Sequence, residues 1–179
     1  MKKYVFLFAL LLFIGSRGLA QGEKKFSVYA IGFYNLENLF DTCHDEGKND
    51  YEYLPEGSMK WNGRKYSNKL RNMSRVLSEM GTDMLPKVGC AAIGVSEVEN
   101  AKALTDQPAL AARGYKFCHI EGEDKRGVDC ALLYNPKMFT VRNVKLVPYV
   151  QALAKDSSYK TRGFLTVSGT LGGEHVAII

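Results

Sequence analysis

The chain has 179 residues, of which 46% are hydrophobic and 24% are charged, which is the composition of one ordinary globular domain. This composition excludes a disordered chain, a collagen-like chain and a small disulfide scaffold. The formal net charge of +5 falls to +2 without residues 1–20, which carry three basic residues and no acid, so the sequence does not indicate a basic protein that coats nucleic acid.

The N-terminus has the pattern of an export signal. Lys2 and Lys3 precede an apolar run over residues 4–14, and small residues stand before a cleavage point after Ala20. The run is shorter than the roughly 20 residues that span a bilayer. We therefore expect residues 1–20 to be a signal peptide, the mature protein to be exported (periplasmic or secreted), and no stable membrane anchor to be present.

The first half of the mature chain predicts a strand, a loop and a helix. Residues 26–34 alternate in a strand-like way and stop at the polar residues 35–38. Residues 41–63 are rich in acids and read as a long surface loop. Residues 67–80 place apolar side chains at helical intervals, with Ser67 as the expected N-cap, a glycine after the last residue and a basic outer face.

A second strand and several more elements follow. Residues 90–95 form a continuous apolar run, typical of a strand buried on both faces. A helical stretch over residues 101–113 is closed by Gly114. The remaining strand-like runs are residues 115–120, 128–134, 139–150, 164–171 and 175–179. Strands interleaved with helices predict an α/β fold.

The four cysteines show neither a CxxC pair nor the spacing of a zinc finger. Residues 122–127 read as a hairpin loop, and a turn centred on Asp124 would place Cys118 opposite Cys130. Opposed strand residues are close enough to form a disulfide. Buried free thiols are also common, so the sequence leaves both states open and favours free thiols.

Two polar residues at strand ends carry the candidate chemistry. Asn35 closes the first predicted strand, and Glu97 follows the buried one. Binding sites in α/β sheets assemble outside strand ends, and carboxylate and amide oxygens suit Mg²⁺ or Ca²⁺. From the residues alone a second interpretation stays open, with Asn35 as a turn residue and Glu97 or Glu99 as an acid at a helix start.

Three segments in the same order resemble the endonuclease/exonuclease/phosphatase superfamily of the deoxyribonuclease I and exonuclease III type. They are residues 33–42, 93–100 and 125–134. Residues 53–57, Lys60-Trp61 and the helix carrying Lys69 are similar to the exported, bacterial branch of that superfamily.

The resemblance implies an α/β (α+β) fold, a four-layer α/β/β/α sandwich of two packed mixed sheets, with residues 21–179 as the N-terminal part of that domain. It also implies hydrolysis of phosphoesters with Mg²⁺, or Mn²⁺ or Ca²⁺, as the cofactor. By the same resemblance Glu97 binds the metal, Asn35 lies near it, and Arg126 and Arg162 contact substrate phosphate.

The later motifs of the superfamily are Asn-His, Asp-x-Asn and a water-activating Asp-His, and this sequence contains none of them. We expect them after Ile179, so the sequence is interpreted as C-terminally truncated and no catalytic residue is assigned in it. His44 is interpreted as a solvated loop residue and His119 as a satisfied sheet residue. The remaining carboxylates that could join a metal are interpreted as solvated: Asp41, Glu99 and Asp129.

The functional prediction is an exported, metal-dependent phosphodiesterase of nucleic acid, most simply a nuclease. Other phosphodiesters, phospholipid headgroups and phosphomonoesters stay open as substrates, and no protein partner is inferred. We expect this chain alone to be inactive. The alternative is a non-catalytic exported binding module, or an inactive gene fragment, with the same fold.

Overall fold

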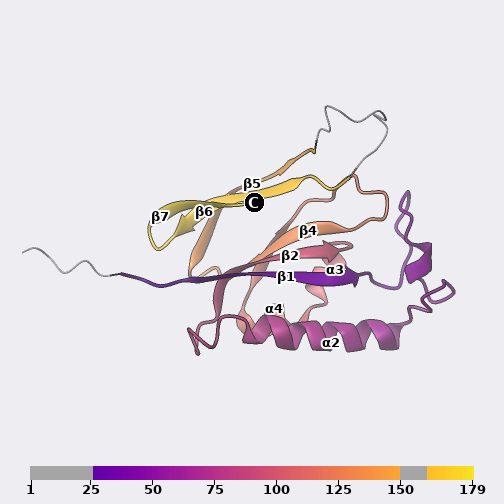
Figure 1. The fold of residues 1–179 in the computed structure, drawn as a ribbon, viewed down its shortest axis with the longest axis horizontal. Helices are drawn as coiled ribbons and strands as arrows, with labels where there is room; N and C mark the ends of the chain where they lie inside the picture. The colour runs from indigo at the N-terminus through magenta and orange to yellow at the C-terminus, as the bar shows by residue number, and fades with distance from the viewer. Residues whose placement is uncertain (1–25, 150–160) are drawn as a thin grey trace, which may run out of the picture.

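A computed structural model describes residues 26–149 and 161–179. Two sheets lie face to face, and helices cover the outer side of the first sheet (Figure 1). These are α, β and β layers of the expected sandwich. The predicted signal peptide, residues 1–20, and Val150, the last residue of a predicted strand, lie outside the described residues.

The first sheet is mixed and has the strand order β1-β2-β4-β3. β1 runs parallel to β2, and the other two pairings are antiparallel. The second sheet has the order β5-β6-β7 and is antiparallel within the described residues. The strands of the first sheet are β1 Ala30–Leu39, β2 Cys90–Val98, β3 Lys116–His119 and β4 Asp129–Tyr134, and those of the second are β5 Phe139–Val147, β6 Phe164–Leu171 and β7 Glu174–Ile178.

The first strand differs from its prediction at both ends. Pairing begins at Ala30, opposite Cys90, whereas Phe26 is 87% exposed, because alternation alone does not make a strand without a partner. At the other end β1 continues through the polar residues as far as Leu39. Leu36 and Leu39 are buried. Because both side chains pack in the core, the polar residues between them are part of the strand.

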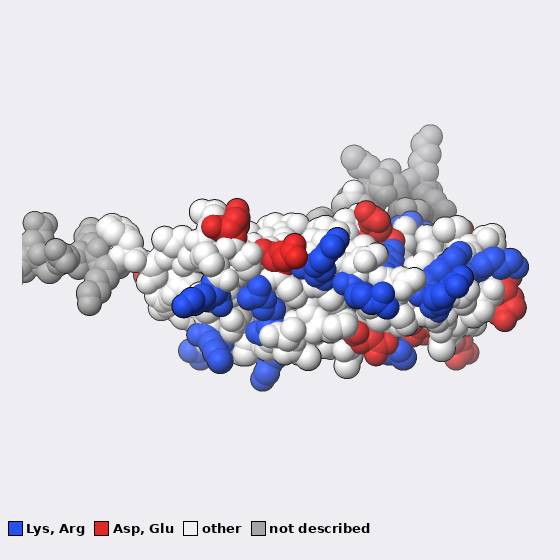
Figure 2. Space-filling model, turned by 90° about the horizontal axis from the view of Figure 1, so that it is seen from below, with Lys and Arg blue, Asp and Glu red and all other residues white. Residues whose placement is uncertain are grey.

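The long helix α2 spans Gly63–Glu79, four residues earlier than predicted at its start. Asn62, not Ser67, is the N-cap, and its side-chain oxygen accepts the backbone N–H of Lys65 at 3.2 Å. One side of α2 is buried and the other is basic, as predicted. Figure 2 shows this side of the molecule, with Lys and Arg side chains spread along it.

The helical stretch predicted over residues 101–113 is two short helices, α3 Ala101–Thr105 and α4 Pro108–Arg113. Proline lacks the N–H that a continuous helix requires, so Pro108 begins a new helix instead of extending α3. Gly114 ends α4 in the left-handed conformation, with φ of 66°, as predicted. A single 3-10 turn, η1 Tyr51–Tyr53, interrupts the acidic loop.

Two apolar cores hold the layers together. The first, between the first sheet and the helices, includes Leu77, Ile93, Leu104 and Leu133. The second, between the two sheets, includes Ala92, Cys118, Leu132, Phe139, Leu165 and Val167. Within the described part of the chain, no helix is long and apolar enough to span a lipid bilayer.

The pairing of β3 with β4 puts Leu132, not Cys130, opposite Cys118. All four cysteines lie in the described residues and all four are free thiols. Burial raises the pKa of the Cys118 thiol, which keeps it protonated and unreactive. The hairpin therefore does not align the two cysteines, and the free thiols that the sequence favoured are confirmed.

Candidate active site at the strand ends

Glu97 occupies a bulge where β2 meets both of its neighbours. Toward β4, Ser96 pairs with Cys130 and Val98 pairs with Asp129, so Glu97 has no counterpart between them. Glu97 has a φ of +61°. A left-handed conformation costs a non-glycine residue about 1 kcal/mol or more, and such strain concentrates at functional sites.

The same bulge distorts β1. On the β1 side, Asn35 pairs with Ser96 and Leu39 pairs with Val98. Three residues of β1, 36–38, therefore lie between these two pairs, where β2 has only Glu97. Glu37 and Asn38, in that segment, have φ values of +52° and +58°. The ends of β1 and β2 therefore form one irregular segment, to which β1 contributes Asn35 and β2 contributes Glu97.

Backbone groups of the bulge hold both candidate ligands in place. The N–H of Asn38 donates to Glu97 Oε2 at 3.0 Å, and the N–H of Glu37 donates to Asn35 Oδ1 at 2.6 Å. From α2, the Lys69 ammonium donates to the carbonyl oxygens of Glu37 and Asn38. Burial lowers the pKa of Lys69, and the charges of Glu37 and Glu97 oppose that shift. The bulge is therefore tied to the helix layer as well.

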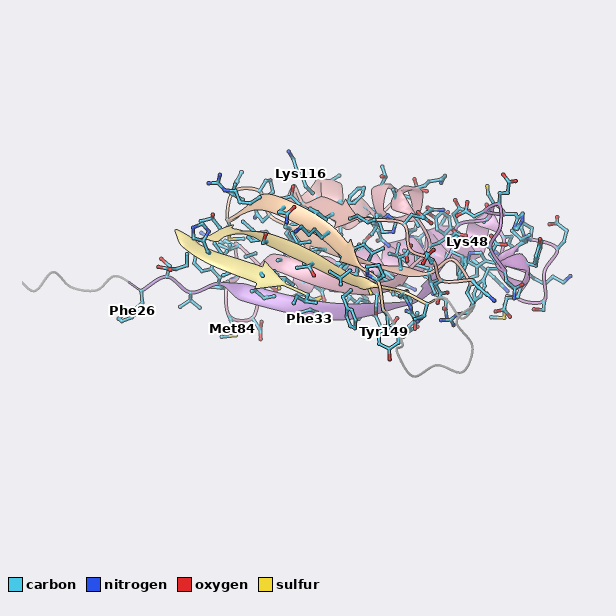
Figure 3. The ribbon with its side chains drawn as sticks, turned by 90° about the horizontal axis from the view of Figure 1, so that it is seen from above. Phe26, Phe33, Lys48, Met84, Lys116 and Tyr149 are labelled. Atoms are coloured by element: carbon cyan, nitrogen blue, oxygen red, sulfur yellow. The ribbon has the colours of Figure 1, made fainter. Side chains whose placement is uncertain are left out.

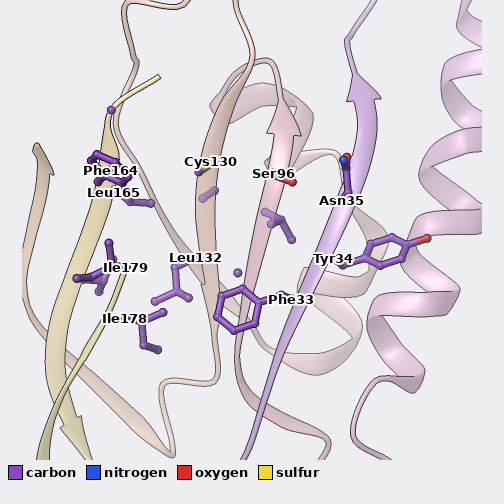
Figure 4. A pocket seen from close by; sticks show the side chains of 15 residues that line it. Phe33, Tyr34, Asn35, Ser96, Cys130, Leu132, Phe164, Leu165, Ile178 and Ile179 are labelled. Atoms are coloured by element: carbon purple, nitrogen blue, oxygen red, sulfur yellow. The ribbon is translucent and has the colours of Figure 1, made fainter. Parts of the chain in front are cut away.

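Asn35 opens into a cleft of about 420 Å³ between the two sheets. Ser96 and Cys130 line the same cleft, and most of its other walls are apolar (Figure 4). The half-buried Glu97 carboxylate and the exposed Asn35 amide, on neighbouring strands, provide hard oxygen ligands at partly solvated positions. This donor set suits Mg²⁺, Mn²⁺ or Ca²⁺.

The two predicted phosphate-binding arginines meet at Asp124. Arg126 Nε lies 3.7 Å from Asp124 Oδ1, and Arg162 Nε lies 3.9 Å from Asp124 Oδ2. The two arginines are therefore brought close to each other by one carboxylate, that of Asp124.

The prediction that the three remaining carboxylates are solvated is wrong. Asp41, Glu99 and Asp129 are all buried. Each accepts a backbone N–H: Glu99 from Asp41, Asp41 from Cys43, and Asp129 from Gly122. Such hydrogen bonds replace the water that the carboxylates lose on burial.

His44 is exposed in the acidic loop, as interpreted, and it also has partners in the protein. His44 Nδ1 lies 2.5 Å from Asp50 Oδ1, and its ring stacks on Tyr51. The His119 side chain is 5% exposed, and its Nε2 lacks a hydrogen-bond partner among the described residues. His119 is therefore a sheet residue, as expected, but it is not satisfied.

Sequence reasoning missed Glu121, which joins His119 and Asp129 in a cluster whose ligand atoms all lie within 4.8 Å of one another. A signal was present, because His119 and Glu121 are two residues apart and such residues share one face of an extended chain. The third member, Asp129, comes from across the hairpin and depends on the strand register.

The layers and the strand-end ligands define a two-sheet α/β protein with a candidate divalent-metal centre. Residues 30–179 match the Endonuclease/Exonuclease/phosphatase family, and the chain belongs to that family. Its members are phosphoesterases and nucleases that generally use divalent metals.

Solved structures of similar fold include a truncated TDP2 from Caenorhabditis elegans, with 20% identity and a TM-score of 0.40 over 60% of this chain and 37% of that one. Another is ANGEL2, a 2′,3′-cyclic phosphatase, with 15% identity and a TM-score of 0.39 over 68% of this chain and 31% of that one. The chain thus spans about a third of the length of these structures. No curated protein matches the sequence.

Proposed function

We propose that this protein is an exported phosphodiesterase, a nuclease in its simplest form, whose divalent ion is bound in part by Glu97 and Asn35. The observation that carries the proposal is the strained bulge, in which backbone N–H groups hold the Glu97 carboxylate and the Asn35 amide oxygen on adjacent strands. Membership of the family supports the phosphoesterase class. Export rests on the signal-peptide pattern of residues 1–20.

Each residue has a defined part in this proposal. Glu97 and Asn35 bind the ion, which when bound neutralises phosphate charge and stabilises the leaving oxygen. Arg126 and Arg162 bind the phosphate group of the substrate, for which Asp124 holds them close together. Lys69 positions the bulge through its two carbonyl partners.

Glu97→Gln tests the centre without removing the hydrogen bond that organises the bulge, because the amide oxygen still accepts the N–H of Asn38. We expect this variant to bind Mn²⁺ at least about tenfold more weakly, since it loses the charge of a ligand. We expect it also to lose Mg²⁺-dependent cleavage of DNA, RNA or an aryl phosphodiester. Binding is measured by electron paramagnetic resonance, and cleavage is measured by the release of product.

Glu46→Gln is the matched control, because it removes a carboxylate from an exposed position of the acidic loop. It should leave both measurements unchanged. Full activity of Glu97→Gln would remove Glu97 from its role. Mn²⁺ binding without cleavage of any of the three substrates would favour the non-catalytic binding module instead.

A further inference from the structure

We propose that His119, Glu121 and Asp129 form a second metal site, for a divalent transition-metal ion such as Zn²⁺ or Mn²⁺. The site is separate from the centre at Asn35 and Glu97. It lies at the ends of β3 and β4 that the hairpin loop connects. It does not depend on the proposed phosphodiesterase activity.

Strand register brings the three ligands together. His119 pairs with Ala131 in the antiparallel β3–β4 ladder, and continuing that register brings Glu121 to the level of Asp129. His119 Nε2 lies 3.5 Å from Asp129 Oδ2, and the three ligand atoms lie within 4.8 Å of one another. A tetrahedral ion with bonds of about 2.1 Å has ligands roughly 3.4 Å apart, so the His119–Asp129 pair already has that spacing.

The unpartnered nitrogen of His119 points independently to a ligand. The side chain is 5% exposed, and Nε2 has no hydrogen-bond partner anywhere in residues 26–149 and 161–179. Its contact with Asp129 Oδ2 at 3.5 Å is an ion pair when the ring is protonated and not a hydrogen bond, and a buried ring nitrogen without a hydrogen bond is unfavourable. Metal coordination would satisfy it, with the Asp129 carboxylate on the same side of the ion.

Glu121 is the adjustable ligand of the three. Its side chain is 52% exposed, so it is free to close the remaining distance. Lys48, at the loop end of the molecule (Figure 3), lies 3.9 Å from Glu121 Oε1 and opposes a cation there. Lys48 also donates to the carbonyl oxygens of Gly122 and Asp124, so it keeps two partners when Glu121 turns to the ion.

The ligand set indicates which ions fit. Imidazole nitrogen favours zinc and its neighbours over Mg²⁺ and Ca²⁺, while two carboxylates extend the range to Mn²⁺. The two carboxylates of Glu121 and Asp129 balance the charge of a divalent ion.

Asn35 and the proposed second site face opposite sides of the first sheet. Cys118 and Cys130 belong to the core between the sheets. Side chains alternate along a strand, so their neighbours His119 and Asp129 face the other way. Asn35 lines the cleft between the sheets, on the other face from His119 and Asp129, whereas Glu97 lies on β2 directly before Val98, which pairs with Asp129.

Co²⁺ is the probe, titrated into the full chain carrying Glu97→Gln so that the first centre is weakened. We expect one equivalent to bind and its visible absorption to lack a thiolate charge-transfer band, because the ligands are nitrogen and oxygen. Adding Glu121→Gln should weaken binding at least tenfold. Adding His119→Gln should do the same and alter the absorption spectrum.

Glu46→Gln and His175→Gln are the matched controls, because each removes the same side chain from an exposed position. Neither should change Co²⁺ affinity. Since His119 is buried, its replacement could impair folding, whereas Glu121→Gln changes an exposed side chain and keeps the test independent of folding. The proposal would be overturned if adding Glu121→Gln left the Co²⁺ affinity unchanged. It would also be overturned by a thiolate band in the Co²⁺ spectrum of the chain that carries Glu97→Gln alone.

Discussion

Glu99 shows how a single residue can couple the site region to pH. Its side chain is 1% exposed, and one oxygen accepts the N–H of Asp41 at 2.6 Å. Burial raises the pKa of Glu99 to about 8 from an ordinary value of 4.5; the hydrogen bond from Asp41 opposes the shift, and the charges of Asp41, Asp45 and Asp50 add to it. This shift favours the protonated form of the carboxyl group in the folded protein at neutral pH.

This protonation makes the free energy of unfolding fall as pH rises. Between pH 4.5 and 8 the folded state binds a proton at Glu99 that the unfolded state has lost, so stability decreases by up to about 1.4 kcal/mol per pH unit over that window. Below pH 4.5 both states are protonated, and the contribution is complete. We expect Glu99→Gln, which is neutral at every pH, to lose this slope.

Urea unfolding of the parent and of Glu99→Gln at pH 5, 7 and 9 measures the difference. Glu56→Gln changes an exposed acid of the acidic loop, residues 41–63. This variant should keep the pH dependence of the parent. Parallel pH profiles for the parent and Glu99→Gln would show that Glu99 is ionised in the folded protein.

At this scale the sequence placed Glu97 after the buried strand, whereas β2 continues through it to Val98, and the state of its neighbours was not predicted. The segment around residue 97 is a recognisable motif, whereas the left-handed backbone of Glu37 and Glu97 has no sequence signal, and Asn38 gives only the weak preference of asparagine for that conformation. The burial of Glu99 could not be predicted either, because an acid after a strand is ordinarily solvated.

Among the elements, α2 offers the sharpest test of a corrected boundary. The sequence favoured Ser67 as the N-cap, but the structure begins the helix at Gly63 with Asn62 as the cap. We expect Asn62→Ala to lower the free energy of unfolding by about 1 kcal/mol, the usual cost of a lost N-cap. Ser67→Ala should be neutral or slightly stabilising, because an exposed helix interior favours alanine.

Urea denaturation of both variants, monitored by circular dichroism, makes the comparison. The opposite order, with Ser67→Ala the more destabilising, would place the start of α2 where the sequence first suggested. Asn68→Ala is a further control, since Asn68 is exposed inside the same helix and caps nothing.

The elements that the sequence predicted well are those with a strong local pattern. The buried run of β2, the apolar stripe of α2 and the glycine stop of α4 are all encoded within a few residues. Strand ends and the Cys118–Leu132 pairing depend on a partner strand. Such long-range contacts are not visible in a local window, and the paired ends of β1 were missed for that reason.

At the scale of the whole molecule, the two sheets are covered unequally within the described residues. β2 is buried almost throughout, between the helices and the second sheet. The second sheet packs its inner face on the first, with Phe139 as its largest fully buried side chain, and exposes much of β5 and β7. We therefore expect the amide hydrogens of β5–β7 to exchange faster than those of β2.

Phe139→Leu tests whether the second sheet opens as a separate unit. The Phe139 ring packs edge-on against Tyr134, with ring centroids 6.0 Å apart, and replacing it by leucine should cost about 1 kcal/mol. If the sheet opens separately, exchange in β5–β7 becomes about fivefold faster while β2 is unchanged, as measured by hydrogen-exchange mass spectrometry. Phe164→Leu, at a position 51% exposed in β6, should alter neither region. An equal increase in both sheets would instead mean that the two layers unfold together, because the loss of one contact would then be shared by the whole molecule.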